Sequence, residues 1–335
     1  MLNNIIESKN TLLAPYNGLK VTWFDSWHPV IDEALQLLPE METCPHELFR
    51  LLIETHGADQ KRITLFTEKG VPVAVAGLRR ISRRYRFELV TWIIIPDSIF
   101  PTQPGYLMPA LEALGVEVIV CWRRMHSPRP SSLLMRDPEE LAVYQIQCST
   151  SFEDYWRESG HWNTIKRCRN RCRNFNHVIN PPGGVEWTIK NWGPVWDVDP
   201  ILVDDSILSA KYMENQGQHY TFLLLDGEKP VAGHTFLQHG QDMVWQVTYR
   251  DPTYDKFGVG TRLMDIAFHW IAEAGYNSID LGGRHTYKVR WAPPVGEMSI
   301  FTICPEPLFR AKQILKKARS IPGKLSGLGV ENREI

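Results

Sequence analysis

The chain has 335 residues, of which 43% are hydrophobic and 22% are charged. Such a composition is ordinary for globular proteins and excludes a globally disordered chain, and the length suggests about two domains. The formal net charge of −1 gives no overall basic excess that would favour DNA, although a local basic patch remains compatible with it.

The six cysteines are sparse and include no Cys-x-x-Cys pair, so neither a disulfide scaffold nor a zinc ribbon is expected. The first 18 residues lack a basic segment followed by an apolar run, which argues against a signal peptide. The most apolar stretch, residues 89–95, is too short to cross a bilayer. We therefore expect a cytoplasmic protein with no membrane span, no metal and no DNA partner.

Hydrophobic periodicity and turn residues predict the elements of the first half. In order, they are a strand at 19–27, a helix at 45–56, a hairpin of strands at 63–67 and 71–78, a strand at 87–95, a short helix at 109–114, and strands at 116–122 and 143–148.

The same signals predict a similar order in the second half. The elements are helices at 152–157 and 162–176, a strand at 185–192, a helix at 199–215, a hairpin at 220–225 and 231–238, a strand at 243–249, a turn at 255–260, a helix at 261–274, strands at 278–281 and 299–304, and a basic helix at 307–320. Both halves thus contain strand, helix, hairpin, strand, helix and strand. We place domain boundaries after residues 148 and 305, which leaves a C-terminal basic helix and tail at 306–335.

A glycine turn holds the most informative pattern. Gly258 and Gly260 stand between a predicted strand and a long predicted helix, where glycines let backbone N–H groups approach an anion. The segment lacks the Gly-Lys-Ser/Thr ending of a P-loop and the full Gly-x-Gly-x-x-Gly of a dinucleotide fold. Taken alone, it equally fits a turn that only caps the helix.

The order of hairpin, strand, glycine turn, helix and strand resembles the GNAT acyltransferase superfamily. Its turn usually reads Gln/Arg-x-x-Gly-x-Gly/Ala; here Asp255 stands at the first position, while Gly258 and Gly260 match. The resemblance implies an α/β (α+β) fold of tandem GNAT-like domains, each a mixed, mostly antiparallel sheet flanked by helices, with a degenerate N-terminal domain.

Residues 150–304 resemble more closely the two-domain acetyltransferases of the cellulose-biosynthesis type (CelD/BcsL-like). The matching features are Tyr254, the glycine turn, Gly275, Asp280-Leu281-Gly282, Tyr287-Lys288, Trp291, the strand Val231-Ala232-Gly233-His234 and an arginine-rich helix at 162–176. The Ser-Pro of that family's turn is missing.

This resemblance implies acetyl-CoA or another acyl-CoA as co-substrate. The backbone of Val247, Thr248 and Tyr249 would hold the pantetheine. The pyrophosphate would lie on Phe257, Gly258, Val259, Gly260, Thr261 and Arg262.

Three residues are candidates for proton transfer. The resemblance makes Tyr287 the acid that protonates the leaving thiolate. His234, whose unperturbed pKa is about 6.5, and Asp280 are candidate bases. The alternatives are a packed aromatic ring, a buried core histidine and a turn contact, respectively.

The predicted helix at 162–176 carries five basic residues, and no acidic residue occurs between Gly160 and Val185. Arg167 and Arg171, four residues apart, would share a face and bind an anionic acceptor, with His285 and Lys288 as further acceptor contacts. A solvated basic face is the alternative.

The sequence therefore favours an N-acyltransferase that acts on the amine of a small molecule or amino sugar. A Fem-type transferase that uses aminoacyl-tRNA, and a GNAT-fold binding module without activity, stay open as alternatives. The acceptor and the oligomeric state are not readable from the sequence.

Overall fold

The computed structural model describes residues 18–40, 44–55, 57–82, 86–89, 99–124, 135–148, 151–282 and 286–304, together with residues 308, 311 and 314. The elements of the first part are β1 (Leu19–Phe24), α1 (Pro29–Leu35), α2 (His46–Glu54), the short 3₁₀ helix η2 (Ala58–Gln60), β2 (Lys61–Glu68), β3 (Val71–Ser82), β4 (Arg86–Leu89), β5 (Ile99–Pro101), η3 (Pro104–Tyr106), α3 (Leu107–Ala113), β6 (Glu117–Arg124) and β7 (Met135–Gln147).

The second part repeats this plan. Its elements are α4 (Phe152–Glu158), α5 (Trp162–Arg171), β8 (Asn176–Ile179), α6 (Gly184–Val195), α7 (Pro200–Asn215), β9 (His219–Asp226), β10 (Lys229–His239), β11 (Asp242–Arg250), η4 (Pro252–Phe257), α8 (Val259–Glu273), β12 (Ser278–Gly282), η5 (Thr286–Arg290) and β13 (Pro294–Ile303).

One continuous sheet of mixed strands joins the two parts. Its order is β1-β2-β3-β4-β6-β13-β7-β12-β11-β10-β9-β8, with β5 paired to β3 off this path. We call β1 to β6 the N-terminal half and β8 to β12 the C-terminal half. Each half has antiparallel neighbours except for one parallel pair, β4 with β6 and β11 with β12. The tandem α/β architecture expected from the sequence is confirmed.

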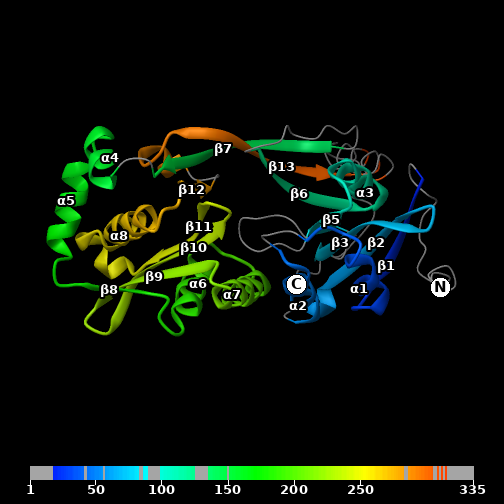
Figure 1. Ribbon diagram of the computed structural model, residues 1–335, viewed down its shortest axis with the longest axis horizontal. Helices are drawn as coiled ribbons and strands as arrows, with labels where there is room; N and C mark the ends of the chain where they lie inside the picture. The colour runs from blue at the N-terminus through cyan, green and yellow to red at the C-terminus, as the bar shows by residue number, and fades with distance from the viewer. Residues whose placement is uncertain are drawn as a thin grey trace, which may run out of the picture.

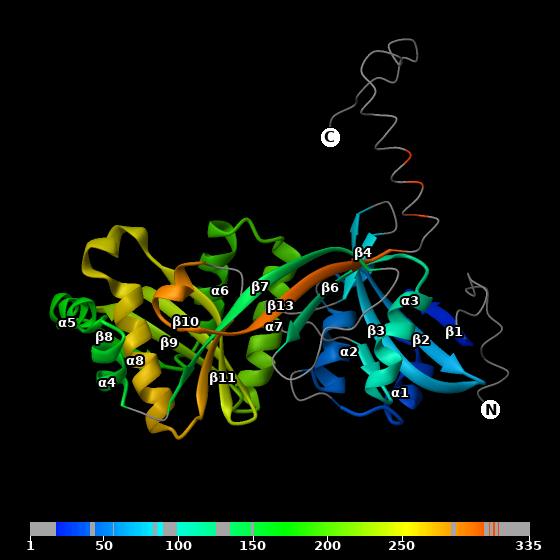
Figure 2. The same ribbon diagram turned by 90° about the horizontal axis from the view of Figure 1, so that it is seen from above.

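The strand order is approximately symmetric about its middle, where β13 and β7 are neighbours. Outward from there, β6, β4, β3, β2 and β1 of the N-terminal half correspond to β12, β11, β10, β9 and β8 of the C-terminal half. β7 pairs with β12 of the C-terminal half, and β13, which comes last in the sequence, pairs with β6 of the N-terminal half. The two long strands also pair with each other and run between the halves (Figures 1 and 2). β13 therefore completes the N-terminal half and β7 the C-terminal half, although neither strand belongs to the sequence range of the half that it completes.

Helices cover the sheet and join the halves through a common core. Side chains of α1, α2 and β2 pack with those of α6 and α7 in one buried cluster. At this joint the ammonium of Lys61 contacts Asp205 at 2.7 Å, and both side chains are fully buried. Burial lowers the pKa of Lys61, while the charge of Asp205 opposes that shift. Arg79 of β3 also pairs with Asp199, the N-cap of α7.

Three predicted elements differ from the structure. The predicted strand at 185–192 is wrong, because these residues lie in α6. Val185, Trp187 and Ile189 alternate as in a strand, but Val185, Thr188 and Ile189 also share one helix face, and that face is the buried one. The predicted helix at 162–176 ends at Arg171, and Asn176 already belongs to β8.

The remaining difference concerns β7, which is much longer than the predicted strand at 143–148. Its first residues, including Arg136, Asp137 and Glu139, are too polar to be recognised as a strand. Most other predicted helices and strands occur with shifted ends. Most of the predicted helix at 307–320, and residues 90–95 of a predicted strand, lie outside the described residues.

Candidate active site

The sheet of the C-terminal half opens between β11 and β12. These parallel strands pair at only three positions, the last of which joins Val244 to Asp280. β11 continues as far as Arg250 and stays paired on its other side with β10. Among the described residues, no partner strand covers one edge of the β11 backbone beyond Val244, and such an edge can pair with an extended ligand.

A β-bulge lies at the start of this opening. Val247 pairs with Thr235, but Trp245 pairs with Phe236, so Gln246 has no opposite residue. A bulge bends the strand and increases its twist, which turns residues 247–249 away from β12. The side chain of Val247 is buried in the core shared by the halves, and Tyr249 packs against Trp187 of α6. Only the backbone of this segment is therefore suited to hold a ligand.

The glycine turn begins α8 at the end of the same strand. After β11, η4 leads to Gly258, which has φ of +74° and acts as the N-cap of the helix without a side-chain cap. The next three N–H groups have no acceptor within the helix. α8 is 15 residues long, so its dipole places partial positive charge at this turn. The turn therefore presents an anion site close to the end of the opened strand.

α5 packs directly against this turn. A Cβ atom added to Gly258 would lie 2.6 Å from Sγ of Cys168, and Sγ of Cys172 lies 3.5 Å from the carbonyl oxygen of Phe257. Gly258 is thus needed twice, for its left-handed backbone and for the close approach of α5. Cys168 and Cys172 are four residues apart, so one face of α5 makes both contacts.

Arg250 explains the unusual Asp255 of the turn. The guanidinium of Arg250 bonds Asp255 at 2.6 Å, and its Cδ atom lies 3.4 Å from the position of a Cβ on Gly260. A cation is therefore held beside the turn by the residue that replaces the expected Gln or Arg. Arg250 is not among the residues predicted from the sequence, although a basic residue at the end of a strand just before the turn indicates a cation near the expected anion site.

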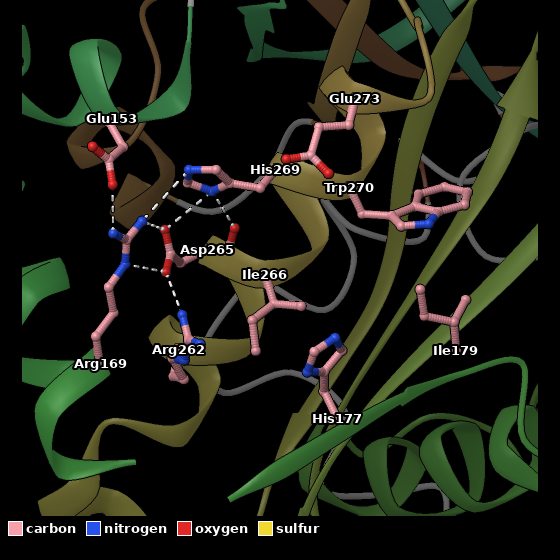
Figure 3. A pocket seen from close by; sticks show the side chains of 10 residues that line it. All are labelled: Glu153, Arg169, His177, Ile179, Arg262, Asp265, Ile266, His269, Trp270 and Glu273. Carbon is pink, nitrogen blue, oxygen red and sulfur yellow. Dashed lines mark hydrogen bonds and ion pairs between the residues drawn. The ribbon is translucent and has the colours of Figure 1, made fainter. Parts of the chain in front are cut away.

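Arg262, a predicted pyrophosphate contact, points elsewhere. Its Nη1 atom bonds Oδ2 of Asp265 at 2.7 Å on the outer face of α8. Asp265 is buried and also accepts hydrogen bonds from Trp156 and from Arg169 (Figure 3). Burial alone would raise the pKa of Asp265, but its bonds to His269 and Arg169 outweigh burial and keep that pKa below its usual range. This ion cluster fastens α4 and α5 to α8.

A cavity of about 340 Å³ lies over this cluster, between α8, α5 and β8. Figure 3 shows Glu153, Arg169 and Asp265 gathered on one side of the view, with Ile179 and Trp270 on the other. The cavity is lined in part by β8, the last strand in the sheet order, whereas the opening lies between β11 and β12. Since Arg169 and Arg262 are already paired with Asp265 and Glu153, the opening with its glycine turn remains the better candidate for the reaction.

The predicted basic pair lies beside the glycine turn. Nη1 of Arg171 donates to the carbonyl oxygen of Lys256 at 2.8 Å. Burial raises the pKa of the Cys168 thiol, and the charges of Arg171, Arg167 and Arg262 oppose that shift. Both Arg167 and Arg171 are exposed. The structure therefore brings the basic pair and the glycine turn together.

His234 lies beneath the turn and is 2% exposed. Its ring stacks on Trp245 with centroids 5.0 Å apart, and Nε2 lies 3.4 Å from Oγ1 of Thr248. Burial lowers the pKa of His234 to about 3, against a smaller opposing effect of the Gly260 backbone. The ring is therefore neutral near pH 7 and a weak base.

The other candidates lie at and after the end of β12. Oδ1 of the buried Asp280 accepts a hydrogen bond from the N–H of Gly282 at 2.6 Å. Nζ of Lys288, also buried, donates to the carbonyl oxygen of Leu281. Tyr287 belongs to η5, and His285 lies outside the described residues. Asp280 and Lys288 thus both bind backbone groups of the last two residues of β12, Leu281 and Gly282.

Comparison with known proteins identifies the central part of this site. Residues 210–289 match the family described as "Acetyltransferase (GNAT) domain". The match includes α8, the glycine turn, both strands of the opening and Tyr287. No curated protein matched the sequence.

Similar solved structures are distant. L-PGS from Bacillus licheniformis has 11% identity and a TM-score of 0.49, and the alignment covers 84% of this chain and 98% of that one. FemX has 10% identity and a TM-score of 0.48, with 86% and 99% covered. A tandem GNAT protein from the clavulanic acid biosynthesis pathway has 8% identity and a TM-score of 0.47, with 85% and 98% covered. At these TM-scores the three structures support no argument about substrate.

Within the part of the chain that the structure describes, no helix is long and apolar enough to span a membrane. Among the same residues, no group of three or more His, Cys, Asp or Glu side chains is placed to share a metal ion.

Proposed function

We propose that this chain, whose residues 210–289 form an acetyltransferase domain of the GNAT superfamily, transfers an acyl group from coenzyme A to the amine of a small molecule or amino sugar. The observation that carries the proposal is the joint occurrence of two features on β11. One edge of the strand is uncovered beyond Val244, and the anion-binding turn at Gly258 follows its end. A pantetheine chain and a pyrophosphate need these two features in this order.

Each part of the donor has a complementary group. The free backbone edge of residues 247–249 would pair with the amides of the pantetheine, as a strand pairs with an added strand. The N–H groups of residues 259–261 would bind the pyrophosphate. Acetyl-CoA supplies the activated acyl carbonyl. Because Arg262 is bound to Asp265, we assign the pyrophosphate to backbone groups and not to the Arg262 side chain.

The amine nitrogen attacks the thioester carbonyl, the C–S bond breaks, and the thiolate takes a proton. We assign that proton to the hydroxyl of Tyr287, which lies in η5 after β12. The amine must lose a proton as well. We prefer Asp280 to His234 for this step, because Asp280 stands at the last paired position before the opening, whereas the ring of His234 is stacked on Trp245.

The assignment to the cellulose-biosynthesis branch remains a proposal. It is supported by residues on both sides of the opening, namely Tyr254 before the turn, the Asp280-Leu281-Gly282 segment of β12, and Tyr287-Lys288. It predicts a carbohydrate or amino-sugar acceptor.

The Fem-type alternative is favoured by one specific observation, the exposed basic face of α5 beside the turn. An enzyme that uses aminoacyl-tRNA would need such a surface for phosphates. It would have no use for the uncovered edge of β11 as a pantetheine site.

Titration calorimetry separates these proposals. The wild type should bind acetyl-CoA, and Gly260→Asp should weaken that binding at least tenfold, by about 1.4 kcal/mol, because a carboxylate would occupy the phosphate position. Gly105→Asp, in the corresponding segment of the N-terminal half, is the matched control and should leave binding unchanged, since open space surrounds Gly105. Tight binding of tRNA without binding of acetyl-CoA would favour the Fem-type function. Binding of acetyl-CoA without turnover of any amine would favour an inactive module.

A further inference from the structure

The basic residues of α5 differ in whether their charge is already neutralised. Arg169 donates to Asp265 at 2.9 Å and to Glu153 at 2.9 Å, so its charge is balanced within the ion cluster (Figure 3). Arg171 donates only to a neutral carbonyl, that of Lys256. For Arg167 no acidic partner lies within ion-pair distance among the described residues. Two uncompensated guanidinium groups therefore remain on this helix near the turn.

The position of these two groups is fixed by packing. Cys168, adjacent to Arg167, packs on Gly258, and Cys172, adjacent to Arg171, contacts the carbonyl of Phe257. Residues four apart on a helix lie on the same face, so Arg167 and Arg171 stand next to each other. The hydrogen bond to Lys256 holds Arg171 at the turn itself. The pair thus flanks the N-terminus of α8 from a separate helix.

A phosphomonoester is the anion that such a pair fits best. It carries nearly two negative charges and three acceptor oxygens, and guanidinium groups bind phosphate with paired hydrogen bonds. The pyrophosphate already has the backbone N–H groups of α8. The donor in our proposed function carries one further phosphate, the 3′-phosphate of its ribose, which is a monoester.

We propose that Arg167 and Arg171 bind the 3′-phosphate of coenzyme A and so select free acyl-CoA over thioesters that lack it, such as acyl groups on a carrier protein. This inference rests on the proposed function, since it assumes that the pyrophosphate lies on the glycine turn. It reassigns the two arginines from the acceptor to the donor.

The experiment compares coenzyme A with 3′-dephospho-coenzyme A by titration calorimetry. The wild type should bind coenzyme A at least tenfold more tightly. In the Arg167→Gln/Arg171→Gln variant the ratio of the two dissociation constants should fall to about one. Arg167→Gln alone should lower the ratio partly, and it removes no contact that holds the turn.

Lys166→Gln/Arg173→Gln is the matched control. It removes the same charge from the same segment, but Arg173 lies after the end of α5, and neither residue is among the charges that act on the Cys168 thiol beside the turn. Its ratio should stay at the wild-type value. A decrease equal to that of the arginine pair would reduce the effect to net charge and overturn the proposal.

The remaining outcomes are distinct. If the wild type binds both nucleotides equally, the 3′-phosphate site is refuted while the proposed function stands. If it binds neither, the proposed function fails. If the two nucleotides bind equally and the arginine variant instead loses affinity for tRNA, the surface binds RNA and the proposal is overturned.

Discussion

The two halves share one order of elements but differ where a helix follows the opened strand. In the C-terminal half, Gly258 adopts φ of +74° and starts a helix of 15 residues. In the N-terminal half, α3 has seven residues and begins after Tyr106, whose backbone is already helical. Both halves keep a parallel pair with three paired positions.

This difference shows which part of the fold makes a site. The parallel pair belongs to the architecture and occurs in both halves. The anion site needs in addition a left-handed N-cap residue and a long helix directly after the opened strand; α8 meets this condition and α3 does not. The N-terminal half is joined to its neighbour through β13 and the shared core.

The largest expected effect comes from breaking the joint between the halves. Lys61→Met leaves Asp205 buried without its 2.7 Å partner, and loss of one member of a buried ion pair typically costs about 3–5 kcal/mol. Urea unfolding should show this loss. Lys211→Met, which removes an exposed partner of Glu186, should cost less than about 1 kcal/mol. A Lys61 variant as stable as the Lys211 variant would show that the halves do not depend on this contact.

The next largest effect concerns the proton that the thiolate takes up as it leaves. Tyr287→Phe should lower kcat by a factor on the order of 10 to 1,000, within the usual range for acid–base catalysis or below it, because a thiol with a pKa of about 8.5 leaves readily without help. Affinity for acetyl-CoA should remain unchanged. Single-turnover rates measured beside calorimetry test this, and a wild-type rate would transfer the role to another residue.

A third change sharpens the comparison of the two helix starts. Gly258→Ala places a side chain in the left-handed region, which costs roughly 1–2 kcal/mol, and its Cβ would lie 2.6 Å from Cys168. Gly105→Ala meets nothing within 4 Å and should change stability by no more than about 0.5 kcal/mol. Thermal and urea unfolding of both variants provide the measurement. Equal stability of the two would mean that α5 moves freely away from the turn.

An effect of similar size is a dependence of stability on pH. Burial lowers the pKa of His219 to about 4, whereas in the unfolded chain its pKa is about 6.5. The unfolded state therefore takes up the proton first as the pH falls, and stability decreases from near pH 6.5 toward pH 4. Between pH 7 and pH 5 this amounts to about 2 kcal/mol.

Urea midpoints at the two pH values test this for His219→Gln, which should lose about 2 kcal/mol less than the wild type over the same interval. The control is His177→Gln, at an exposed position, which should follow the wild type. A wild-type midpoint that does not change between pH 7 and pH 5 would contradict the prediction.

The sequence by itself determined the order of elements and the glycine turn, because both are local. Gly258 and Gly260 mark a helix start, and apolar residues at helical spacing mark the buried face of α8. Residues 185–192 fit both the alternation of a strand and the spacing of a helix, so their sequence does not distinguish the two. They form a helix in the structure because one face of that helix packs on β10 and β11.

Tertiary structure alone decided the rest. It placed α5 on the turn through Cys168, brought Arg250 to Asp255, and directed Arg262 to Asp265. It also inserted β7 and β13 between the halves. The contact of Cys168 with Gly258 and the pairing of β7 and β13 with the two halves join segments far apart in sequence. The pairs Arg250–Asp255 and Arg262–Asp265 are local in sequence, but the direction of each arginine side chain depends on which partner reaches it. A pattern of neighbouring residues does not contain that information.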